Sequence, residues 1–432
     1  MAVTPLNVSY FLQTRYKFVK IRDVKKKISL TLVFILCAVF SSVFSYAAYR
    51  TYNYHKPAVS TFPIIDISND GVTIQDIKDN GKDTRYGASF AIDSENLYQK
   101  VELKGRGNST FLAEKMPFQV KFSEKTELYG LGKSKKWVLL ANYYDASNLR
   151  NALAYYLERL LGEQYALDGR FVELWYNGEN QGLYYLSPKV EIGKDRVDLR
   201  DPMGILVEFD TLHNNNKDCH YTKYKKCMTI SDEVAEDNAE VAMADFMKSF
   251  NALIDAAKVH DYNTVSRLAD VESLAIYYLL NEFTVNPDGY ASSFFLYKDG
   301  PGDKIHAGPG WDFDFALSNR QWYWSKDEGF YSPTETQYQR RWNDGAQCDL
   351  FYNLTDTPEF MSVVKNIFNE RMSGKKEEMM AFFLQNTTEI KDRALYNNIQ
   401  HDLRNFTEEV YDLADWVSQR YDYFEQVYGY QN

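Results

Sequence analysis

The chain has 432 residues, and 60 acidic side chains outnumber 49 basic ones, which gives a formal net charge of −11. That length allows one large domain or two moderate ones, and an apolar fraction of 45% is ordinary for a globular protein. General nucleic-acid-binding proteins carry an excess of lysine and arginine on one face. No basic patch is evident here outside the N-terminal tail and one short loop, so we expect no nucleic-acid partner.

Residues 28–48 form an uncharged apolar run, long enough to cross about 30 Å of hydrocarbon as a helix. Seven basic side chains lie before this run: Arg15, Lys17, Lys20, Arg22, Lys25, Lys26 and Lys27. Far fewer basic side chains lie in the stretch directly after the apolar run. Because positive charge is retained on the cytoplasmic side of a membrane, this asymmetry predicts a cytoplasmic N-terminus.

The pattern divides the chain into a basic cytoplasmic tail (1–27), a transmembrane signal-anchor helix (28–48), a linker (49–60) and a main domain (61–432). The main domain is then extracytoplasmic or luminal, and the protein crosses the membrane once. A cleaved signal peptide is the alternative, with Ser45-Tyr46-Ala47 as a small-residue cleavage site. The basic region is long for a signal peptide, which favours an uncleaved anchor.

The main domain begins with runs that predict β-strands. Strands are expected at 63–67, 98–104, 118–122 and 136–140, and a hairpin at 171–186 turns at Asn177-Gly178. Between them, apolar spacing over 149–161 predicts a helix, which Asp145 or Ser147 can cap and Gly162 can end.

A buried strand is predicted next, at 204–210, and the polar stretch 211–235 is expected to be a loop or insert. Helical periodicity covers 238–259 and 263–283, and residues 355–430 are expected to be mainly helical. Strands first and helices later indicate an α+β fold.

Two cysteines, Cys219 and Cys227, flank a short lysine-rich stretch. In an oxidising compartment they could form a disulfide that closes a small exposed loop. Two free thiols are the main alternative. A metal site that includes His220 is the weakest option, because no zinc-ligand spacing supports it.

A glycine-containing loop, Gly105-Arg106-Gly107-Asn108-Ser109-Thr110, interrupts the predicted strands. Such a loop can offer backbone N–H groups and a cation to phosphates, although a plain tight turn is the commoner use of Gly-X-Gly. Lys115 and Lys121 follow it, and a lysine near a phosphate loop can hold phosphate oxygens as a point charge. A solvated strand lysine is the alternative.

Acidic residues recur near the middle of the chain. Asp288 lies in an Asn286-Pro287-Asp288-Gly289 turn, whereas Asp312 and Asp314 follow a strand-like stretch. Along a strand, Asp312 and Asp314 would point to the same face and repel each other unless a cation compensates. Mg²⁺ or Mn²⁺, bound by these carboxylates and by phosphate oxygens, fits this layout. An exposed acidic edge is the alternative.

These pieces, in this order, resemble the CotH (spore coat protein H) kinase family. The matching stretches within 60–375 are 105–110, 115–122, 137–151, 176–186, 204–210, 286–288 and 311–314. The resemblance implies an atypical protein-kinase-like fold, with a mainly β N-lobe and a mainly α C-lobe. It also implies ATP, a divalent metal and transfer of phosphate to Ser or Thr of protein substrates.

Carried over by position, the resemblance makes Asp288 the catalytic aspartate and Asp312 the metal-binding aspartate, supported by Asp314. Lys115 or Lys121 would contact phosphate. In the same way, Arg106 and Asn108 would shape the loop over the phosphates, and Glu158 is a candidate to pair with the lysine.

Two departures from the family pattern stand out. Ser293 occupies the position, five residues after Asp288, where the family usually has an asparagine that binds the second metal. Pro188 lies in a stretch where a Glu-Lys pair is more usual, which would alter an adenine-contacting hinge. The alternative function is therefore a catalytically impaired pseudokinase that acts as a surface or coat binding or assembly protein.

Overall fold

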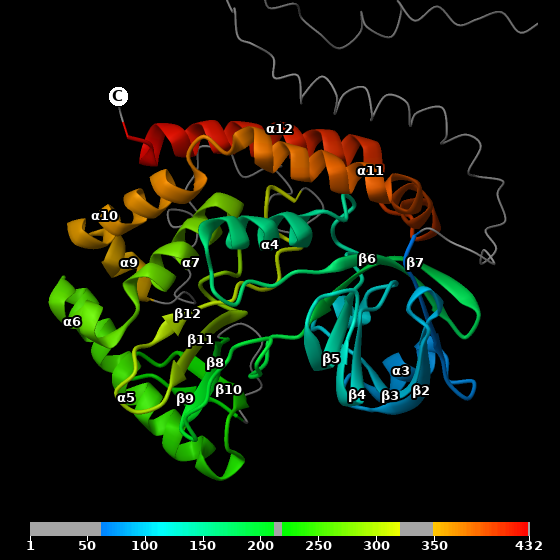
Figure 1. Ribbon diagram of the computed structural model, residues 1–432, viewed down its shortest axis with the longest axis horizontal. Helices are drawn as coiled ribbons and strands as arrows, with labels where there is room; N and C mark the ends of the chain where they lie inside the picture. Colours follow the sequence, from blue (N-terminus) through cyan, green and yellow to red (C-terminus); the bar gives the residue numbers. More distant parts are fainter. Residues whose placement is uncertain (1–61, 211–217, 320–348, 431–432) are drawn as a thin grey trace, which may run out of the picture.

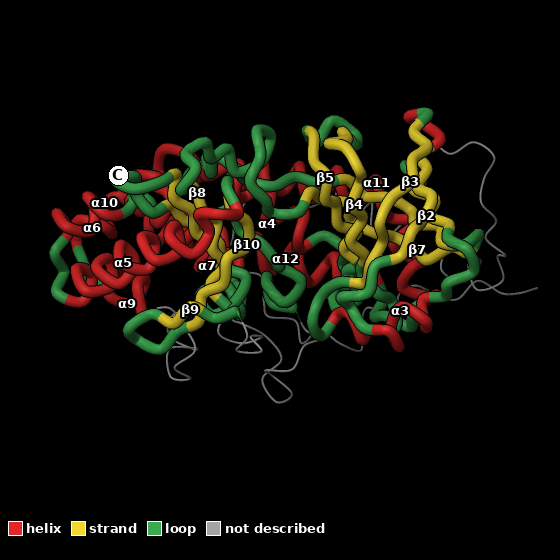
Figure 2. The backbone as a smooth tube through the Cα atoms, turned by 90° about the horizontal axis from the view of Figure 1, so that it is seen from below, coloured by secondary structure: helices red, strands yellow, loops and turns green. Residues whose placement is uncertain are grey.

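The computed structural model describes residues 62–210, 218–319 and 349–430. The fold is mixed α+β, as the sequence predicts. Strands dominate one end of the molecule, whereas the other end combines most of the helices with a second group of strands, as Figure 2 shows. The predicted tail, anchor and linker lie outside the described residues. Within the described ranges, no helix is both long enough and apolar enough to span a bilayer.

A closed β-barrel forms the N-terminal part (Figure 1). Its strands are β1 (Ile64–Ser68), β2 (Tyr86–Ile92), β3 (Leu97–Gly105), β4 (Phe118–Glu127), β5 (Lys133–Leu140), β6 (Arg170–Tyr176) and β7 (Glu179–Pro188). They follow the order β1-β2-β3-β4-β5-β7-β6, and parallel pairing of β1 with β6 closes the barrel. The strands expected in this part are confirmed, whereas β2 and helix α3 (Ile74–Asn80) were not predicted.

The barrel interior follows from the alternation of side chains along its strands. On β4, Phe118, Val120 and Phe122 are fully buried, and Phe122 packs edge-on against Phe90 of β2 at 5.1 Å between ring centroids. The β6–β7 hairpin turns where Asn177 and Gly178 both have positive φ, as a type I′ turn requires. The simple mainly β lobe of the prediction is thus a closed barrel with its own core.

Helix α4 (Arg150–Leu161) leaves the barrel between β5 and β6, close to its predicted bounds. Gly162 ends it in the left-handed conformation. Leu149, rather than Asp145 or Ser147, occupies the N-cap. Both polar residues nevertheless bond the first amides, because Asp145 accepts from Arg150 N at 2.9 Å and Ser147 Oγ accepts from Leu149 N at 3.2 Å.

The second part contains a five-stranded antiparallel sheet in addition to helices. The sheet strands, β8 (Gly204–Phe209), β9 (His220–Tyr221), β10 (Cys227–Glu233), β11 (Phe294–Asp299) and β12 (His306–Ala307), lie in the order β12-β11-β8-β10-β9. The helices beside it are α5 (Ala239–Lys258), α6 (Tyr262–Leu268), α7 (Val271–Thr284), α9 (Asp349–Thr355) and α10 (Pro358–Ile367). A mainly α C-lobe is therefore an incomplete description.

Two predictions in this part need correction. The stretch 211–235, expected to be a loop or insert, contains β9 and β10. β9 is the edge strand of the sheet and pairs only with the start of β10, so the rest of β10 is half-buried and accommodates polar side chains. The helix expected at 263–283 is two helices, α6 and α7. Asp270 separates them, because its side chain caps α7 by accepting from Ser273 N at 2.8 Å.

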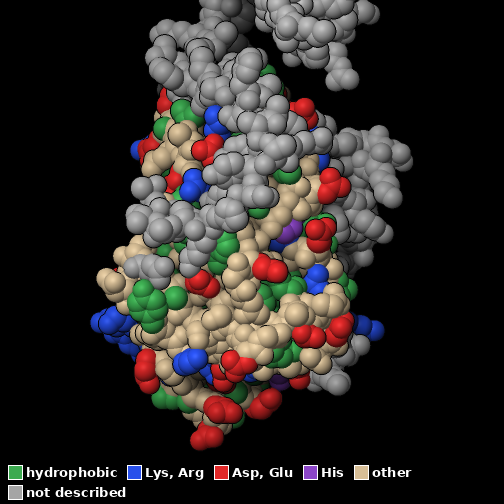
Figure 3. Space-filling model, turned by 90° about the vertical axis from the view of Figure 1, so that its right-hand side faces the viewer, with side chains coloured by type: hydrophobic (Ala, Val, Ile, Leu, Met, Phe, Trp, Pro, Cys, Tyr) green, Lys and Arg blue, Asp and Glu red, His purple; other side chains and the backbone are tan. Residues whose placement is uncertain are grey.

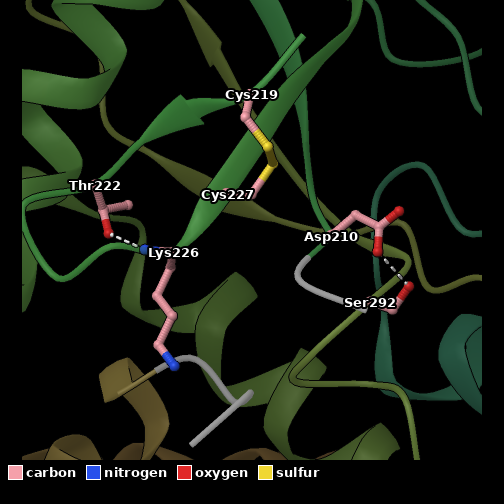
Figure 4. The surroundings of a disulfide bond; sticks show 6 residues. All are labelled: Asp210, Cys219, Thr222, Lys226, Cys227 and Ser292. Atoms are coloured by element: carbon pink, nitrogen blue, oxygen red, sulfur yellow. Dashed lines mark hydrogen bonds between the residues drawn. A yellow bond between two sulfur atoms is a disulfide. The ribbon is translucent and has the colours of Figure 1, made fainter. Parts of the chain in front are cut away.

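Cys219 and Cys227 form a disulfide, with their Cα atoms 5.2 Å apart. It joins the start of β10 to the residue before β9, as Figure 4 shows. Of the three alternatives left open by the sequence, the disulfide is therefore the one found.

Two long C-terminal helices, α11 (Lys376–Gln400) and α12 (Phe406–Tyr428), run side by side along one side of the molecule (Figure 1). They confirm the mainly helical prediction for 355–430. The end of α11 reaches the barrel hairpin, where Gln400 Nε2 donates to Asn180 O at 2.6 Å. On the face of the molecule seen in Figure 3, basic and acidic side chains are interspersed.

Candidate active site

A cavity of about 130 Å³ lies between the barrel and the second part of the fold. The described residues that line it are Arg106, Gly107, Asn108, Ser109, Thr110, Pro117, Leu140, Ala141, Asn142, Glu208, Asp288, Ser292, Ser293, Trp311, Asp312, Asp314 and Phe315. Six residues singled out from the sequence are among them: Arg106, Asn108, Asp288, Ser293, Asp312 and Asp314. Segments far apart in the chain, from Arg106 to Phe315, thus meet at one site.

The glycine loop at the end of β3 forms the barrel side of the cavity. Gly105 must be glycine, because a Cβ there would overlap the Phe111 ring, and Gly107 has φ +90°. Arg106 N donates to Pro117 O at 3.1 Å, and the Arg106 guanidinium lies 5.1 Å from the centre of the Trp311 ring. The loop therefore brings one cation against the opposite wall.

Asp288 lies in a turn that follows α7. Asn286 is buried and shapes this turn: its Oδ1 accepts from Asp288 N at 3.2 Å, and its Nδ2 donates to Asp312 O at 3.3 Å. Gly289 must be glycine, because a Cβ would overlap Asn281 Oδ1. Asn286 thus links the turn of Asp288 directly to the segment of Asp312.

Asp312 and Asp314 do not lie on a strand, which corrects the prediction that they share a strand face. Asp312 has φ +66°, and the chain turns after it. Their carboxyl groups nevertheless lie close enough to interact. Burial of Asp314, together with the neighbouring Asp312 carboxyl, raises the pKa of Asp314 well above its usual range. Two such groups share a proton or a cation.

A divalent cation fits this pair of carboxyls, since it would relieve their repulsion. In the described ranges, no group of three or more His, Cys, Asp or Glu side chains is arranged to hold a metal. A cation here would therefore draw its other ligands from phosphate oxygens, water or the neutral oxygens of the lining, among which are those of Ser292 and Ser293.

Asn151 of α4 holds the Asp312–Asp314 segment from inside. Its Oδ1 accepts from Phe313 N at 2.9 Å, and its Nδ2 lies 3.3 Å from both Asp314 Oδ1 and Asn142 Oδ1. Sequence reasoning assigned no role to Asn151. A polar residue on the buried face of a predicted helix was the signal that could have found it.

Arg150, the neighbour of Asn151, is fully buried and anchors the end of the same segment. It pairs with Asp145 and with Glu409 of α12, the latter at 2.9 Å, and its Nε donates to Ala316 O at 3.0 Å. These two carboxylates and this carbonyl oxygen stabilise the buried positive charge of Arg150.

Glu158 does not pair with a lysine, which corrects that prediction. Its Oε1 accepts from Gly310 N at 2.5 Å, just before Trp311 and Asp312. Burial and the nearby Glu163 carboxyl raise the pKa of Glu158 to about 8, and burial raises the pKa of Glu163 to about 7. The two carboxyls flank the backbone at Gly308 and Gly310.

The two predicted phosphate lysines do not line the cavity. Lys115 is buried; its Nζ donates to Ala141 O at 2.8 Å, to Asn397 Oδ1 at 2.7 Å and to Leu183 O. Burial lowers the pKa of Lys115 well below its usual range. Lys121 points outward from β4, opposite to the buried phenylalanines, and lies 3.6 Å from Glu102. Arg106 is thus the one cation among the described lining residues.

Several polar cavity residues had no role predicted from the sequence, among them Glu208, Asn142 and Ser292. Glu208 is the one polar residue within the buried strand β8, which was a usable signal. Asn142 has φ +49° after β5 and could not be found from periodicity. Pro188 ends β7 opposite Trp137 and is not part of the lining.

Comparison with known proteins gives one match to a protein family. A family model described as CotH kinase protein matches residues 103–424, which include every described residue that lines the cavity. No curated protein matches the chain.

Proposed function

The chain belongs to the CotH kinase family, and on that premise we propose that it transfers the γ-phosphate of ATP to Ser or Thr hydroxyls of extracytoplasmic proteins. One observation carries the proposal: Asp288, the Asp312–Asp314 pair and the glycine loop line a single cavity. Phosphoryl transfer needs little covalent chemistry from the protein, so positioned charges and an orienting carboxylate are the required parts.

In this proposal each wall of the cavity has its own task. Asp288, half-buried at the base of its turn, would accept or orient the proton of the attacking hydroxyl. Asp312 and Asp314 would hold Mg²⁺ or Mn²⁺, which supplies positive charge against the phosphate oxygens when bound. Arg106 and the backbone of its loop would face the phosphates from the barrel side.

We propose that the barrel acts as the N-lobe and the helix-rich part as the C-lobe of an atypical kinase-like fold. The two separate hydrophobic cores support this division. The position of the cavity between them supports it too, since kinases bind nucleotide between two lobes.

We also propose that residues 28–48 anchor the protein, with the kinase domain outside the cytoplasm. The uncharged run and the Cys219–Cys227 disulfide support this topology, because disulfides persist in oxidising compartments. Protease added to the cytoplasmic face of sealed vesicles checks the topology, because it should leave the kinase domain intact. Digestion of the kinase domain under these conditions would contradict the topology.

The test of activity is phosphate transfer by the full-length, detergent-solubilised protein. With labelled ATP and Mg²⁺ or Mn²⁺, Asp288→Asn and Asp312→Asn should each lower transfer about 100- to 10,000-fold. Lys121→Ala is the matched control, because that side chain lies on the outer face of the barrel. A parent protein without transfer, or transfer unchanged in both aspartate variants, would refute the proposal.

Ser293 favours a second candidate, a pseudokinase that retains the fold and acts as a binding or assembly protein. It lines the cavity where the family usually has asparagine. Nucleotide binding without turnover in the parent, followed by turnover in Ser293→Asn, would establish this candidate.

A further inference from the structure

Ser292, the residue before Ser293, lies in a setting built around its hydroxyl group. It is 3% exposed yet contributes to the lining of the cavity. Its Oγ donates to Asp210 Oδ1 at 2.9 Å, and Figure 4 shows the two side chains facing each other. The backbone N of Ser292 donates to Asp288 O at 2.8 Å. This serine is therefore tied both to a carboxylate and to the turn that carries Asp288.

Asp210 is held in place by the sheet beside it. It follows β8, whose last residue, Phe209, pairs with Phe294 of β11 on one side and with Met228 of β10 on the other. Its backbone N lies 3.4 Å from the carbonyl oxygen of Cys227, one of the disulfide-bonded cysteines. The carboxylate that accepts the hydrogen bond from Ser292 Oγ is thus held in place by the sheet.

A hydroxyl whose proton is committed to a carboxylate presents its oxygen as an acceptor. The carboxylate also increases the electron density on that oxygen, as second-shell carboxylates do for metal ligands. Ser293, by contrast, has φ +53°, and no hydrogen bond of its side chain is found among the described residues. Of the two neighbouring serines, Ser292 is the one with an oriented oxygen.

We propose that Ser292, oriented by Asp210, is the neutral oxygen ligand for the divalent cation at the Asp312–Asp314 pair, in place of the asparagine that the family usually has at position 293. Ser292 is the ligand, and Asp210 is a positioning residue that acts through it. The inference rests on the proposed function for the presence of a cation, but it predicts binding and not turnover.

The first test measures Mn²⁺ binding to the full-length protein in the presence of a non-hydrolysable ATP analogue, by electron paramagnetic resonance. Ser292→Ala and Asp210→Ala should each weaken Mn²⁺ binding about 10- to 100-fold. The double variant should be no weaker than Ser292→Ala, because Asp210 acts through Ser292. Ser293→Ala is the matched control and should change binding less than about threefold.

A second test separates ligation from damage to the fold. Ser292→Cys replaces a hard oxygen by a soft sulfur and should shift binding from Mg²⁺ toward Cd²⁺. Ser293→Cys should leave this preference unchanged. Thermal denaturation identifies variants that have lost the fold.

The outcomes distinguish this proposal from the proposed function. Weakened Mn²⁺ binding in the Ser292 and Asp210 variants of a parent that transfers no phosphate would support the ligand and refute the kinase. Normal Mn²⁺ binding in folded Ser292→Ala, or a metal-preference shift in Ser293→Cys only, would overturn the ligand while leaving phosphate transfer untouched.

Discussion

The two walls of the cavity differ in how they are held. On the acidic wall, residues 310–316 are held by Glu158, Asn151 and Arg150, each about 1% exposed. On the barrel wall, Asn108 is exposed and its side chain is held by an exposed lysine, Lys82, at 2.7 Å. Buried polar groups fix one arrangement, whereas exposed hydrogen bonds exchange with water. The difference indicates a preorganised acidic wall and a loop that adjusts to the ligand.

Arg150→Met should break the acidic wall most severely. It leaves Asp145 buried without its cation and Glu409 with Arg404 as its remaining basic partner, and we expect a loss of about 3–5 kcal/mol in the free energy of unfolding. Denaturant or thermal unfolding measures this loss. Lys121→Met, which removes a half-exposed ion pair with Glu102, is the control and should cost about 0–1 kcal/mol. Similar losses in both variants would contradict the comparison.

Asn151→Leu should act on catalysis. Leucine keeps the volume but leaves Phe313 N without its acceptor, so Asp312 and Asp314 lose their fixed positions. We expect kcat to fall about 100-fold while KM for ATP changes little. Steady-state kinetics on folded protein check this. A rise in KM at constant kcat would mean that the acidic wall is no better fixed than the loop.

Glu158→Gln should change how stability depends on pH. Because the pKa of Glu158 is raised to about 8 in the folded protein, the native state binds more protons than the unfolded chain between about pH 4.5 and 8. Stability of the parent therefore falls as pH rises through this window. Glutamine can still accept from Gly310 N, so the variant should be more stable by roughly 1–2 kcal/mol at pH 8 and equal near pH 4.5. Parallel pH profiles of melting temperature would show that this carboxyl does not titrate as described.

Lys82→Ala should have the smallest effect and should be confined to the barrel wall. It removes one exposed hydrogen bond to Asn108, worth about 0.5–1 kcal/mol. We expect KM for ATP to rise about two- to fivefold with kcat unchanged. A fall in kcat comparable to that of Asn151→Leu would erase the distinction between the walls.

Sequence reasoning worked where the structure depends on neighbouring residues. Glycines at 105 and 107 and the Asn286-Pro287 turn are local signals, and they located the two chain reversals that carry Arg106 and Asp288. Apolar runs, alternation and the Asn177-Gly178 turn predicted the barrel strands other than β2. The roles assigned to the cavity residues remain predictions, although the cavity brings six of them together.

Prediction from the sequence failed where the residue that binds a side chain lies far away in the chain. Lys115 has the sequence context of a phosphate lysine, but Asn397 and two carbonyls bind its ammonium group. Glu158 suited a pair with a lysine, but it bonds to the backbone of Gly310. Asp312 takes a positive φ that residue type does not suggest. Tertiary contacts decide each of these, and no local pattern records them.

The long-range contacts of Lys115 and of Arg150 on α4 with the last two helices bear on synthesis. Lys115 is translated 282 residues before Asn397, and Arg150 is translated 259 residues before Glu409. At about 5–20 residues per second, a ribosome needs roughly 15–60 seconds to close each gap. During that interval the nascent chain carries two cations whose burial sites are incomplete. Chains that stop before α12 should therefore be recognised as unfinished and degraded, and the barrel should reach its final form only after the C-terminus leaves the ribosome.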